Sequence, residues 1–216
     1  IGTLAAGVAH EINNPLTGIL LYASILNSDK RLDPALLPDL ERVISETRRC
    51  AGIVKDLLEF SRESSPAKEP TDLEAVLDDV INFFQKQPDF SSITITKKYG
   101  NDLPNISVDP NQIRQVFLNL VINAGHAMPQ GGILEISTYQ SADAEYVCAG
   151  IKDTGEGISE ENIARIFDPF FTTKPEGTGL GLAISYGIIE NNGGKIEVES
   201  TLGKGTLFVV MLRNSD

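Results

Sequence analysis

A histidine with polar neighbours interrupts an apolar, helix-like stretch near the start of the chain. In AAGVAHEINNPLTGIL, apolar residues recur at helical spacing around His10, Glu11 and Asn14. If the flanking apolar residues pack against a partner helix, His10 faces outward, and Asn14, one turn further on, lies on the same outer face. Pro15 removes the backbone hydrogen bond to the carbonyl of Glu11 and tends to bend the helix there, and such strain often marks a functional site. The alternative is an ordinary solvated polar face.

Two asparagines with helical spacing form a candidate metal site. Asn119 and Asn123 in NLVINA are one turn apart and share one face of a predicted helix. Their carboxamide oxygens can ligate a hard cation such as Mg²⁺. Because surface asparagines are common, the pair is equally consistent with a solvated helix face and does not by itself identify a metal site.

An aspartate at the end of a predicted strand is a candidate ligand for a purine. In DTGEGI, Asp153 is followed by Gly155 and Gly157, which permit a turn with a close backbone approach. Strand alternation places the aspartate on the same face as Val147, Ala149 and Ile151. A carboxylate on such a face requires a hydrogen-bond donor, and the amino group of a purine would supply one. The alternative is an Asx turn that closes a hairpin.

A glycine-rich segment near residue 180 is a candidate phosphate site. EGTGLGLAIS places Gly177, Gly179 and Gly181 at the start of a predicted helix, where free backbone N–H groups and the helix dipole favour phosphate. The spacing is neither a dinucleotide fingerprint nor a Walker A motif. The preceding IFDPFFTTKPE resembles a mobile flap with hydrophobic anchors and one cation, Lys174. In the last predicted strand pair, Thr206 can offer a hydroxyl to a ligand.

Composition and charge limit the classes of partner. The chain has 216 residues, 41% of them hydrophobic, which suits one or two packed domains. Its formal net charge of -12 disfavours binding to nucleic acid or to anionic lipid. Cys50 and Cys148 lack metal or CxxC spacing, so we interpret them as small buried hydrophobic residues in a reducing compartment. No apolar run reaches the ~20 residues of a membrane span and no signal-peptide pattern opens the chain, so we expect this part to be soluble.

Two apolar seams predict an N-terminal helical hairpin. The first seam steps alternately by four and three through Ile1, Ala5, Val8, Ile12, Pro15, Ile19, Tyr22 and Leu26. After a break at SDKRLDP, a second seam follows Leu40, Val43, Thr47, Cys50, Val54 and Leu57. Asp33 and Pro34 form a helix start, although Pro38 indicates that the regular helix begins later. Two such helices cannot cover both apolar faces, so we expect a second copy to complete a four-helix bundle.

A linker rich in Ser and Pro, ESSPAKEPT, separates this hairpin from a second domain. We place the hairpin at residues 1–66 and the second domain at residues 67–216. The second domain has predicted helices in TDLEAVLDDVINFF, DPNQIRQVFLNLVINAGHAM and GLAISYGIIENN. Its predicted strands are ITITKKY and two hairpins, ILEISTY with YVCAGIKD and KIEVES with TLFVVML. This order indicates an α+β sandwich.

The motifs occur in an order that resembles the catalytic core of two-component sensor histidine kinases over essentially the whole chain. AHEINNPL matches the H box, NQIRQVFLNLVINAGHAM the N box, DTGEGI the G1 box, FDPFFTTK the F box and GTGLGLAIS the G2 box, with GKGT after them. The HEINNPL form is similar to the nitrogen-regulatory type. The resemblance implies an α+β fold with a dimeric four-helix bundle and then a C-terminal α/β sandwich of the Bergerat (GHKL) type, shared with gyrase, mismatch-repair ATPases and a heat-shock chaperone.

The resemblance also implies roles for the residues of the H box. His10 would be the phosphorylated nucleophile and Glu11 its acid/base partner. Asn14 would orient water for dephosphorylation of the partner protein. The implied activity is that of a protein-histidine kinase in signal transduction, with ATP-dependent autophosphorylation of His10, transfer to an aspartate in the receiver domain of a cognate response regulator, and phosphatase activity toward that regulator.

The remaining boxes would bind ATP, with ADP as product, and Mg²⁺. Asn119 and Asn123 would hold Mg²⁺, and Asp153 would bind adenine. The other implied nucleotide-binding residues are His126, Gly155, Gly157, Phe171, Thr172, Lys174, Gly177, Thr178, Gly179, Leu180, Gly181, Leu182 and Thr206. Many family members carry Lys or Arg where this chain has His126, so this histidine either donates a hydrogen bond to phosphate or caps the helix end.

Two other classes of function were weighed against this kinase. An ATPase of the gyrase or chaperone class has a Glu one turn before the metal-binding Asn, and here that position is Asn119. A scaffold protein without turnover is disfavoured because every box is filled. We expect a homodimer in the cytoplasm that does not bind nucleic acid. Because residue 1 already lies within the first seam, we expect a sensor or membrane region upstream, through which the full-length protein would reach the inner membrane if it does so at all.

Overall fold

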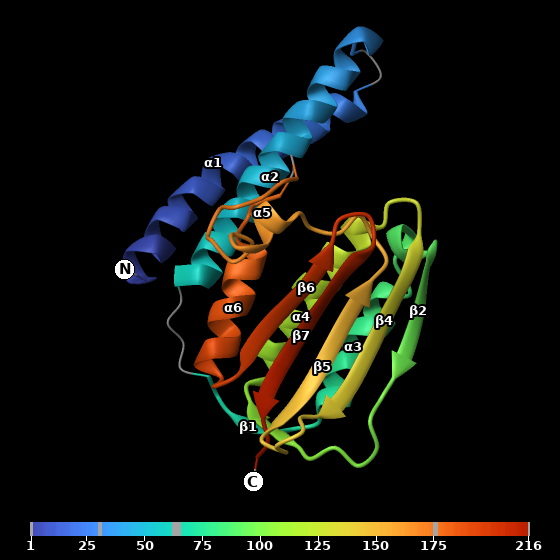
Figure 1. Cartoon of the computed structure of the whole chain (residues 1–216). Helices are drawn as coiled ribbons and strands as arrows, with labels where there is room; N and C mark the ends of the chain where they lie inside the picture. The colour runs from blue at the N-terminus through green and yellow to red at the C-terminus, as the bar shows by residue number, and fades with distance from the viewer. Residues whose placement is uncertain (1, 30–31, 62–65, 175–176, 216) are drawn as a thin grey trace. The chain divides into compact units, whose positions relative to one another are not determined.

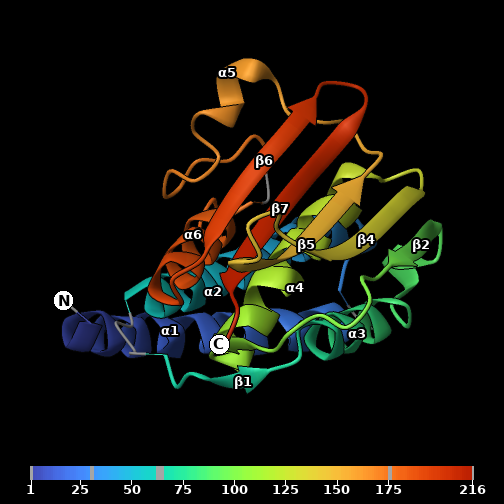
Figure 2. The same ribbon diagram turned by 60° about the horizontal axis from the view of Figure 1, so that its bottom comes forward.

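The computed structural model describes residues 2–29, 32–61, 66–174 and 177–215, without the side chains of residues 2–11, 55–61 and 89. The chain divides into two compact units, one of residues 1–64 with 169–181 and the other of residues 65–168 with 182–216. Figures 1 and 2 show their helices and strands. The domain boundary after residue 66 stays a prediction. No helix in the described ranges combines the length and the apolar character that crossing a bilayer requires.

The first unit contains the predicted helical hairpin. Helix α1, Gly2–Ser28, packs along α2, Leu37–Ser61 (Figure 1). A short 3-10 helix, Pro34–Leu36, precedes α2, and the Asp33 side chain caps it by accepting a hydrogen bond from the Ala35 N–H at 2.9 Å. The predicted late start of the regular helix is therefore confirmed, because Pro34 and Pro38 favour a tight first turn.

The predicted seams coincide only in part with the face that joins α1 to α2, because Thr47 and Val54 of the second seam are buried whereas other seam residues are exposed. Among the hairpin side chains that the structure describes, the buried ones are Ala23 of α1 and Ile44, Thr47 and Val54 of α2. Among the predicted seam residues, Ile19 is 45% and Tyr22 70% exposed, and Leu26, Val43 and Cys50 are also exposed. The prediction that Cys50 is buried is therefore wrong for the single chain. Each helix carries two adjacent apolar stripes, and the 3-4 spacing does not reveal which of them faces the neighbouring helix.

The second unit is an α/β sandwich built on a five-stranded sheet of order β2-β4-β5-β7-β6. The strands are β2 Ile93–Lys98, β4 Gly132–Gln140, β5 Tyr146–Asp153, β6 Lys195–Thr201 and β7 Gly205–Arg213. Helices α3 Leu73–Phe84, α4 Pro110–Ala127 and α6 Gly181–Asn191 lie on one side of it (Figure 2). Both predicted hairpins are confirmed, with β4 and β6 antiparallel to β5 and β7 respectively.

Aspartates at the helix starts explain where α3 and α4 begin. The Asp72 carboxylate accepts from the N–H of Glu74 at 2.9 Å, and the Asp109 carboxylate accepts from the N–H of Asn111 at 3.0 Å. Each bond satisfies a backbone donor that has no partner within the helix. Pro110 occupies the first turn of α4, where its missing N–H costs nothing.

Three features were not predicted from the sequence. Strand β1, Glu69–Thr71, pairs with β3, Ile106–Val108, in a separate two-stranded sheet. Helix α5, Glu160–Ile163, is a single turn. Strand β2 pairs in parallel with β4, so that it forms one edge of the main sheet. These short or long-range features have weak periodic signals in the sequence.

An ion pair and a hydroxyl secure the edge strand β2 to α3. The Asp78 carboxylate accepts from Lys97 Nζ at 2.6 Å and from the Tyr99 hydroxyl at 2.7 Å. The hydrogen bond from Lys97 lowers the pKa of Asp78, whereas burial and then the Asp78 carboxylate raise the pKa of the Tyr99 hydroxyl. Because Lys97 lies in β2 and Tyr99 directly follows it, these two contacts connect the edge strand to α3.

Candidate active site

Helices α4 and α6 run antiparallel, and side-chain hydrogen bonds hold them together. At one end, Asn192 Oδ1 accepts from the backbone N–H of Asp109 at 3.0 Å, and Asn192 Nδ2 donates to Gln112 Oε1 at 2.9 Å. Further along, Asn119 Nδ2 donates to Ser185 Oγ at 3.3 Å. The start of α6 therefore lies alongside the C-terminal half of α4.

The predicted metal residues lie in this C-terminal half. Asn119 and Asn123 are both half-buried, and His126 is exposed in the last turn of α4. Among the described residues no three His, Cys, Asp or Glu side chains form a metal-binding group. Two carboxamide oxygens suit Mg²⁺, which keeps waters and binds substrate phosphates in addition to a few protein ligands. The residues present therefore fit Mg²⁺. For His126, in the last turn of α4, a hydrogen bond to phosphate and capping of the helix end both stay predictions.

Asp153 is a buried carboxylate at the end of β5. It is 4% exposed and lies on the predicted apolar face. Its Oδ1 accepts from the backbone N–H of Gly155 at 2.8 Å and from that of Thr206 at 3.2 Å. The first bond is the Asx turn considered as the alternative, so the turn and a buried carboxylate occur together. Two backbone donors on Oδ1 fix the direction in which the carboxylate points.

The loop after Asp153 is held between the end of α4 and the β6–β7 turn. The Glu156 N–H donates to the carbonyl of Ala127 at 3.1 Å, and the Glu156 carbonyl accepts from the Gly203 N–H at 2.7 Å. A Cβ added to Gly155 would lie 2.5 Å from the Ala127 carbonyl oxygen. Gly157 has a φ of +70°, a conformation that favours glycine. The predicted close backbone approach at these glycines is confirmed.

Ser200 completes this loop, and sequence reasoning missed it. Its Oγ accepts a hydrogen bond from the Ile158 N–H at 2.8 Å and donates one to the Gly205 carbonyl at 3.0 Å. The same Oγ lies 2.9 Å from Thr206 Oγ1, within hydrogen-bonding distance. The Thr206 side chain is buried beside it, so the hydroxyl expected to meet a ligand also contacts Ser200. Ser200 belongs to no recognisable motif and lies in a strand of alternating residues. No signal in the sequence therefore identifies its three hydrogen-bonding partners.

The glycine-rich segment before α6 closes on itself. The Phe170 N–H donates to the Gly179 carbonyl at 2.9 Å, and the φ of Gly179 is +69°. Thr172 Oγ1 accepts from the Lys174 N–H at 3.1 Å, and the Gly177 N–H donates to the Lys174 carbonyl at 3.1 Å. The predicted binding residues here are Phe171, Thr172, Lys174, Gly177, Thr178, Gly179, Leu180 and Gly181, all in the first unit, with Leu182 in the second. Their contact with a nucleotide stays a prediction.

The predicted phosphotransfer residues all lie in α1. His10 and Glu11 are helical, and their side chains lie outside the described part of the structure. Asn14 is exposed. Pro15 lies inside the helix, and two residues later the Thr17 hydroxyl donates to the Asn13 carbonyl at 2.8 Å. A side-chain hydroxyl therefore donates a hydrogen bond to a backbone carbonyl close to the proline.

Comparison with known families identifies the class of protein to which these sites belong. Residues 1–66 match the profile of the His Kinase A (phospho-acceptor) domain. Residues 108–216 match that of the histidine kinase-, DNA gyrase B- and HSP90-like ATPases. The chain belongs to the sensor histidine kinases. The H box thus lies in a phospho-acceptor domain, and the N, G1, F and G2 boxes lie in an ATPase domain.

Histidine kinases from several bacteria are similar to almost the whole chain. Sporulation kinase E of Bacillus subtilis (strain 168) is 37% identical over 98% of the chain and 28% of the relative. Sensor kinase CckA of Brucella abortus (strain 2308) is also 37% identical, over 98% of the chain and 24% of the relative. Sensor histidine kinase ZraS of Escherichia coli (strain K12) is 35% identical over 98% of the chain and 45% of the relative. The chain therefore spans about a quarter to a half of the length of these kinases.

Solved histidine kinases confirm the predicted fold class. Full-length ShkA in complex with AMPPNP superposes with a TM-score of 0.80 at 27% identity, over 100% of the chain and 47% of ShkA. ThkA in complex with the response regulator protein TrrA superposes with a TM-score of 0.72 at 30% identity, over 99% of the chain and 62% of that chain. The helical hairpin followed by the GHKL-type sandwich is thus the shared architecture of these kinases.

Proposed function

We propose that this chain is the catalytic core of a protein-histidine kinase that phosphorylates His10 with ATP and passes the phosphoryl group to an aspartate of a response regulator. The observation that carries the proposal is the tandem match of a phospho-acceptor domain and an ATPase domain. The well-anchored Asp153 carboxylate and the Asn119–Asn123 pair support it, because they supply an acceptor for adenine and oxygen ligands for a cation.

The chemistry requires mainly positioning and charge neutralisation. Neutral His10 has a free ring nitrogen that forms a bond to the γ-phosphorus, while the bond from that phosphorus to the β,γ-bridging oxygen breaks and ADP leaves. Glu11 orients the imidazole and accepts its proton. Asp153 holds the adenine amino group. Asn119 and Asn123 would hold Mg²⁺, which neutralises phosphate charge when bound.

A label-transfer assay tests the proposal. The chain incubated with γ-phosphate-labelled ATP should acquire a label that acid removes and base does not, as expected for a phosphorylated histidine. Release of labelled inorganic phosphate without label on the chain would instead favour an ATPase of the gyrase class. The carboxamide of Asn119 stands where that class has a Glu, and an amide cannot act as the base that activates water.

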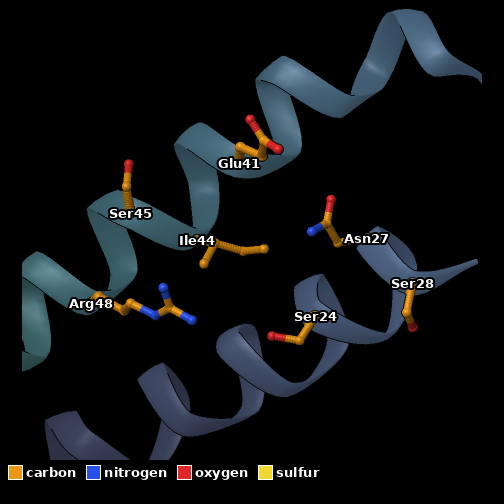
Figure 3. A pocket seen from close by; sticks show the side chains of 7 residues that line it. All are labelled: Ser24, Asn27, Ser28, Glu41, Ile44, Ser45 and Arg48. Atoms are coloured by element: carbon orange, nitrogen blue, oxygen red, sulfur yellow. The ribbon is translucent and has the colours of Figure 1, made fainter. Parts of the chain in front are cut away.

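We propose that the response regulator contacts this kinase at a polar groove on the hairpin. Figure 3 shows Asn27, Ile44 and Arg48 extending into the space between α1 and α2; its other lining residues are Ser24, Ser28, Glu41 and Ser45. His10, Thr17 and Ser24 recur every seven residues, and so do Asn14, Leu21 and Ser28. The groove thus continues the helix face that carries the phosphotransfer residues. We place the receiver domain against this face.

Replacing Asn14 with Ala should separate two activities on this face. Autophosphorylation depends on His10, Glu11 and ATP and should be unchanged, whereas dephosphorylation of the regulator should slow by about 10²-fold because its attacking water is no longer oriented. A regulator phosphorylated by a small-molecule donor is mixed with the variant, Mg²⁺ and ADP, and its decay is followed. Asn13→Ala is the matched control on the neighbouring position. Decay at the wild-type rate in Asn14→Ala would remove Asn14 from the mechanism.

Replacing Tyr22 with Asp should convert a homodimer into a monomer. Ile19, Tyr22 and Leu26 form an exposed apolar stripe on α1, and a charge in a bundle core without a partner strongly disfavours association. Sedimentation velocity measures the change. Leu21→Asp is the control, because Leu21 is 57% exposed on a different face of the same helix and should leave the dimer intact. A dimer that survives Tyr22→Asp but not Leu21→Asp would place the interface on the other face.

A further inference from the structure

A buried hydroxyl interrupts the apolar face of α6. The buried residues of this helix are Ala183, Ile184, Ser185 and Ile189, and Ser185 is 0% exposed. Alanine has the higher helix propensity and buries no polar atom, so packing alone favours alanine at this position. A buried hydroxyl is tolerated when it has a hydrogen-bond partner, and Asn119 of α4 supplies one.

This contact directs the amide nitrogen of Asn119 toward Ser185. The amide nitrogen donates to Ser185 Oγ at 3.3 Å. Because the oxygen and nitrogen of a carboxamide diverge from the same carbon, a nitrogen directed at Ser185 directs Oδ1 away from it. Asn192 accepts a hydrogen bond from the Asp109 N–H and donates one to Gln112, and these bonds hold α4 and α6 in register so that Ser185 stays opposite Asn119.

We propose that Ser185 is a positioning residue that fixes the Asn119 carboxamide with its oxygen toward the Mg²⁺–nucleotide complex. The inference rests on the proposed function, in which Asn119 and Asn123 hold Mg²⁺. Ser185 itself does not touch the cation or the nucleotide. It acts on the orientation of a ligand, as partners of metal ligands do when they hold those ligands in place. Loss of the Ser185 hydroxyl removes this constraint on the amide, whose nitrogen cannot ligate a cation.

Calorimetry of ATP binding, with saturating Mg²⁺ and with a chelator, tests the proposal on the whole chain. We define the magnesium gain as the ATP affinity measured with saturating Mg²⁺ divided by the ATP affinity measured in chelator. Ser185→Ala should reduce this gain about 10-fold and leave the affinity measured in chelator unchanged. Ser185→Cys retains only a weak acceptor and should also reduce the gain, so it answers the same question if the alanine variant does not fold. Thr138→Val is the control, because it removes another buried hydroxyl, one that bonds to Glu74 and Gly100.

A double-mutant cycle identifies the route of the effect. If Ser185 acts through Asn119, the variant Ser185→Ala/Asn119→Ala should lose no more of the gain than Asn119→Ala alone. Additive losses, or an unchanged gain in Ser185→Ala, would overturn the positioning role. Failure of the proposed metal site has a different signature, because Asn119→Ala and Asn123→Ala would then keep the full wild-type gain. A loss of gain in Thr138→Val equal to that in Ser185→Ala would also overturn the proposal, since any buried hydroxyl would then suffice.

Discussion

Replacing His10 with Gln is expected to abolish phosphorylation of the chain while ATP still binds. Glutamine keeps a polar side chain of similar length at this position of α1 but has no nucleophilic ring nitrogen. The substitution lies in the phospho-acceptor domain at residues 1–66, whereas the proposed nucleotide-binding residues lie in the ATPase domain at residues 108–216. Labelled ATP measures the loss, which should reach background, and calorimetry measures ATP affinity, which should match wild type.

The chain supplies its own control for this experiment. It contains two histidines, and the other, His126, lies at the end of α4. His126→Gln should still carry an acid-labile label, although its rate of labelling can fall if His126 contacts phosphate. Label that persists in His10→Gln and disappears in His126→Gln would move the phosphorylation site out of the H box.

Replacing Asp153 with Asn is expected to weaken ATP binding by roughly 10- to 150-fold, the equivalent of about 1.5–3 kcal/mol for a hydrogen bond to a charged group. Oδ1 already accepts from the N–H groups of Gly155 and Thr206. An asparagine must therefore direct its oxygen toward these two donors and its NH₂ toward the base. That NH₂ would face the amino group of adenine, donor against donor.

Calorimetry of ATP binding measures this effect, and thermal unfolding checks that the variant folds. The matched control is Asp79→Asn, which removes the charge of an exposed carboxylate that pairs with Arg114 on the same domain. Surface ion pairs of this kind contribute little, so the control should bind ATP like wild type. A folded Asp153→Asn variant with wild-type ATP affinity would show that Asp153 does not bind the base.

Local signals in the sequence were sufficient for most elements of the second domain. Asp109 followed by Pro110 marks the start of α4 because a side-chain acceptor and a fixed φ both suit the first turn of a helix. The alternation through β5 placed Asp153 on the buried face because side chains along a strand point to opposite sides in turn. These are interactions between residues a few positions apart, and the sequence displays them directly.

Choices between equivalent faces and partners were decided by the tertiary structure. The 3-4 spacing of α1 allows either of two stripes to face α2, and the burial of Ala23 together with the exposure of Tyr22 identifies the one that does. The exposure of Cys50 could not be predicted for the same reason, because it depends on which apolar stripe of α2 faces α1.

The polar contacts around the site depend most strongly on the fold. Asn119 and Ser185 are 66 residues apart in sequence, and Ser200 and Ile158 are 42 apart. Asn119, Ser185 and Ser200 are polar residues in their own segments, Ile158 contributes only its backbone N–H, and no periodic pattern or motif pairs these residues at such distances. The motifs by themselves identified the kinase family and predicted which residues bind ATP and receive phosphate. Only the packed chain decided that the Thr206 backbone N–H contacts Asp153 and that the Ser185 hydroxyl contacts Asn119, because a buried polar group is satisfied by whatever donor or acceptor the fold brings next to it.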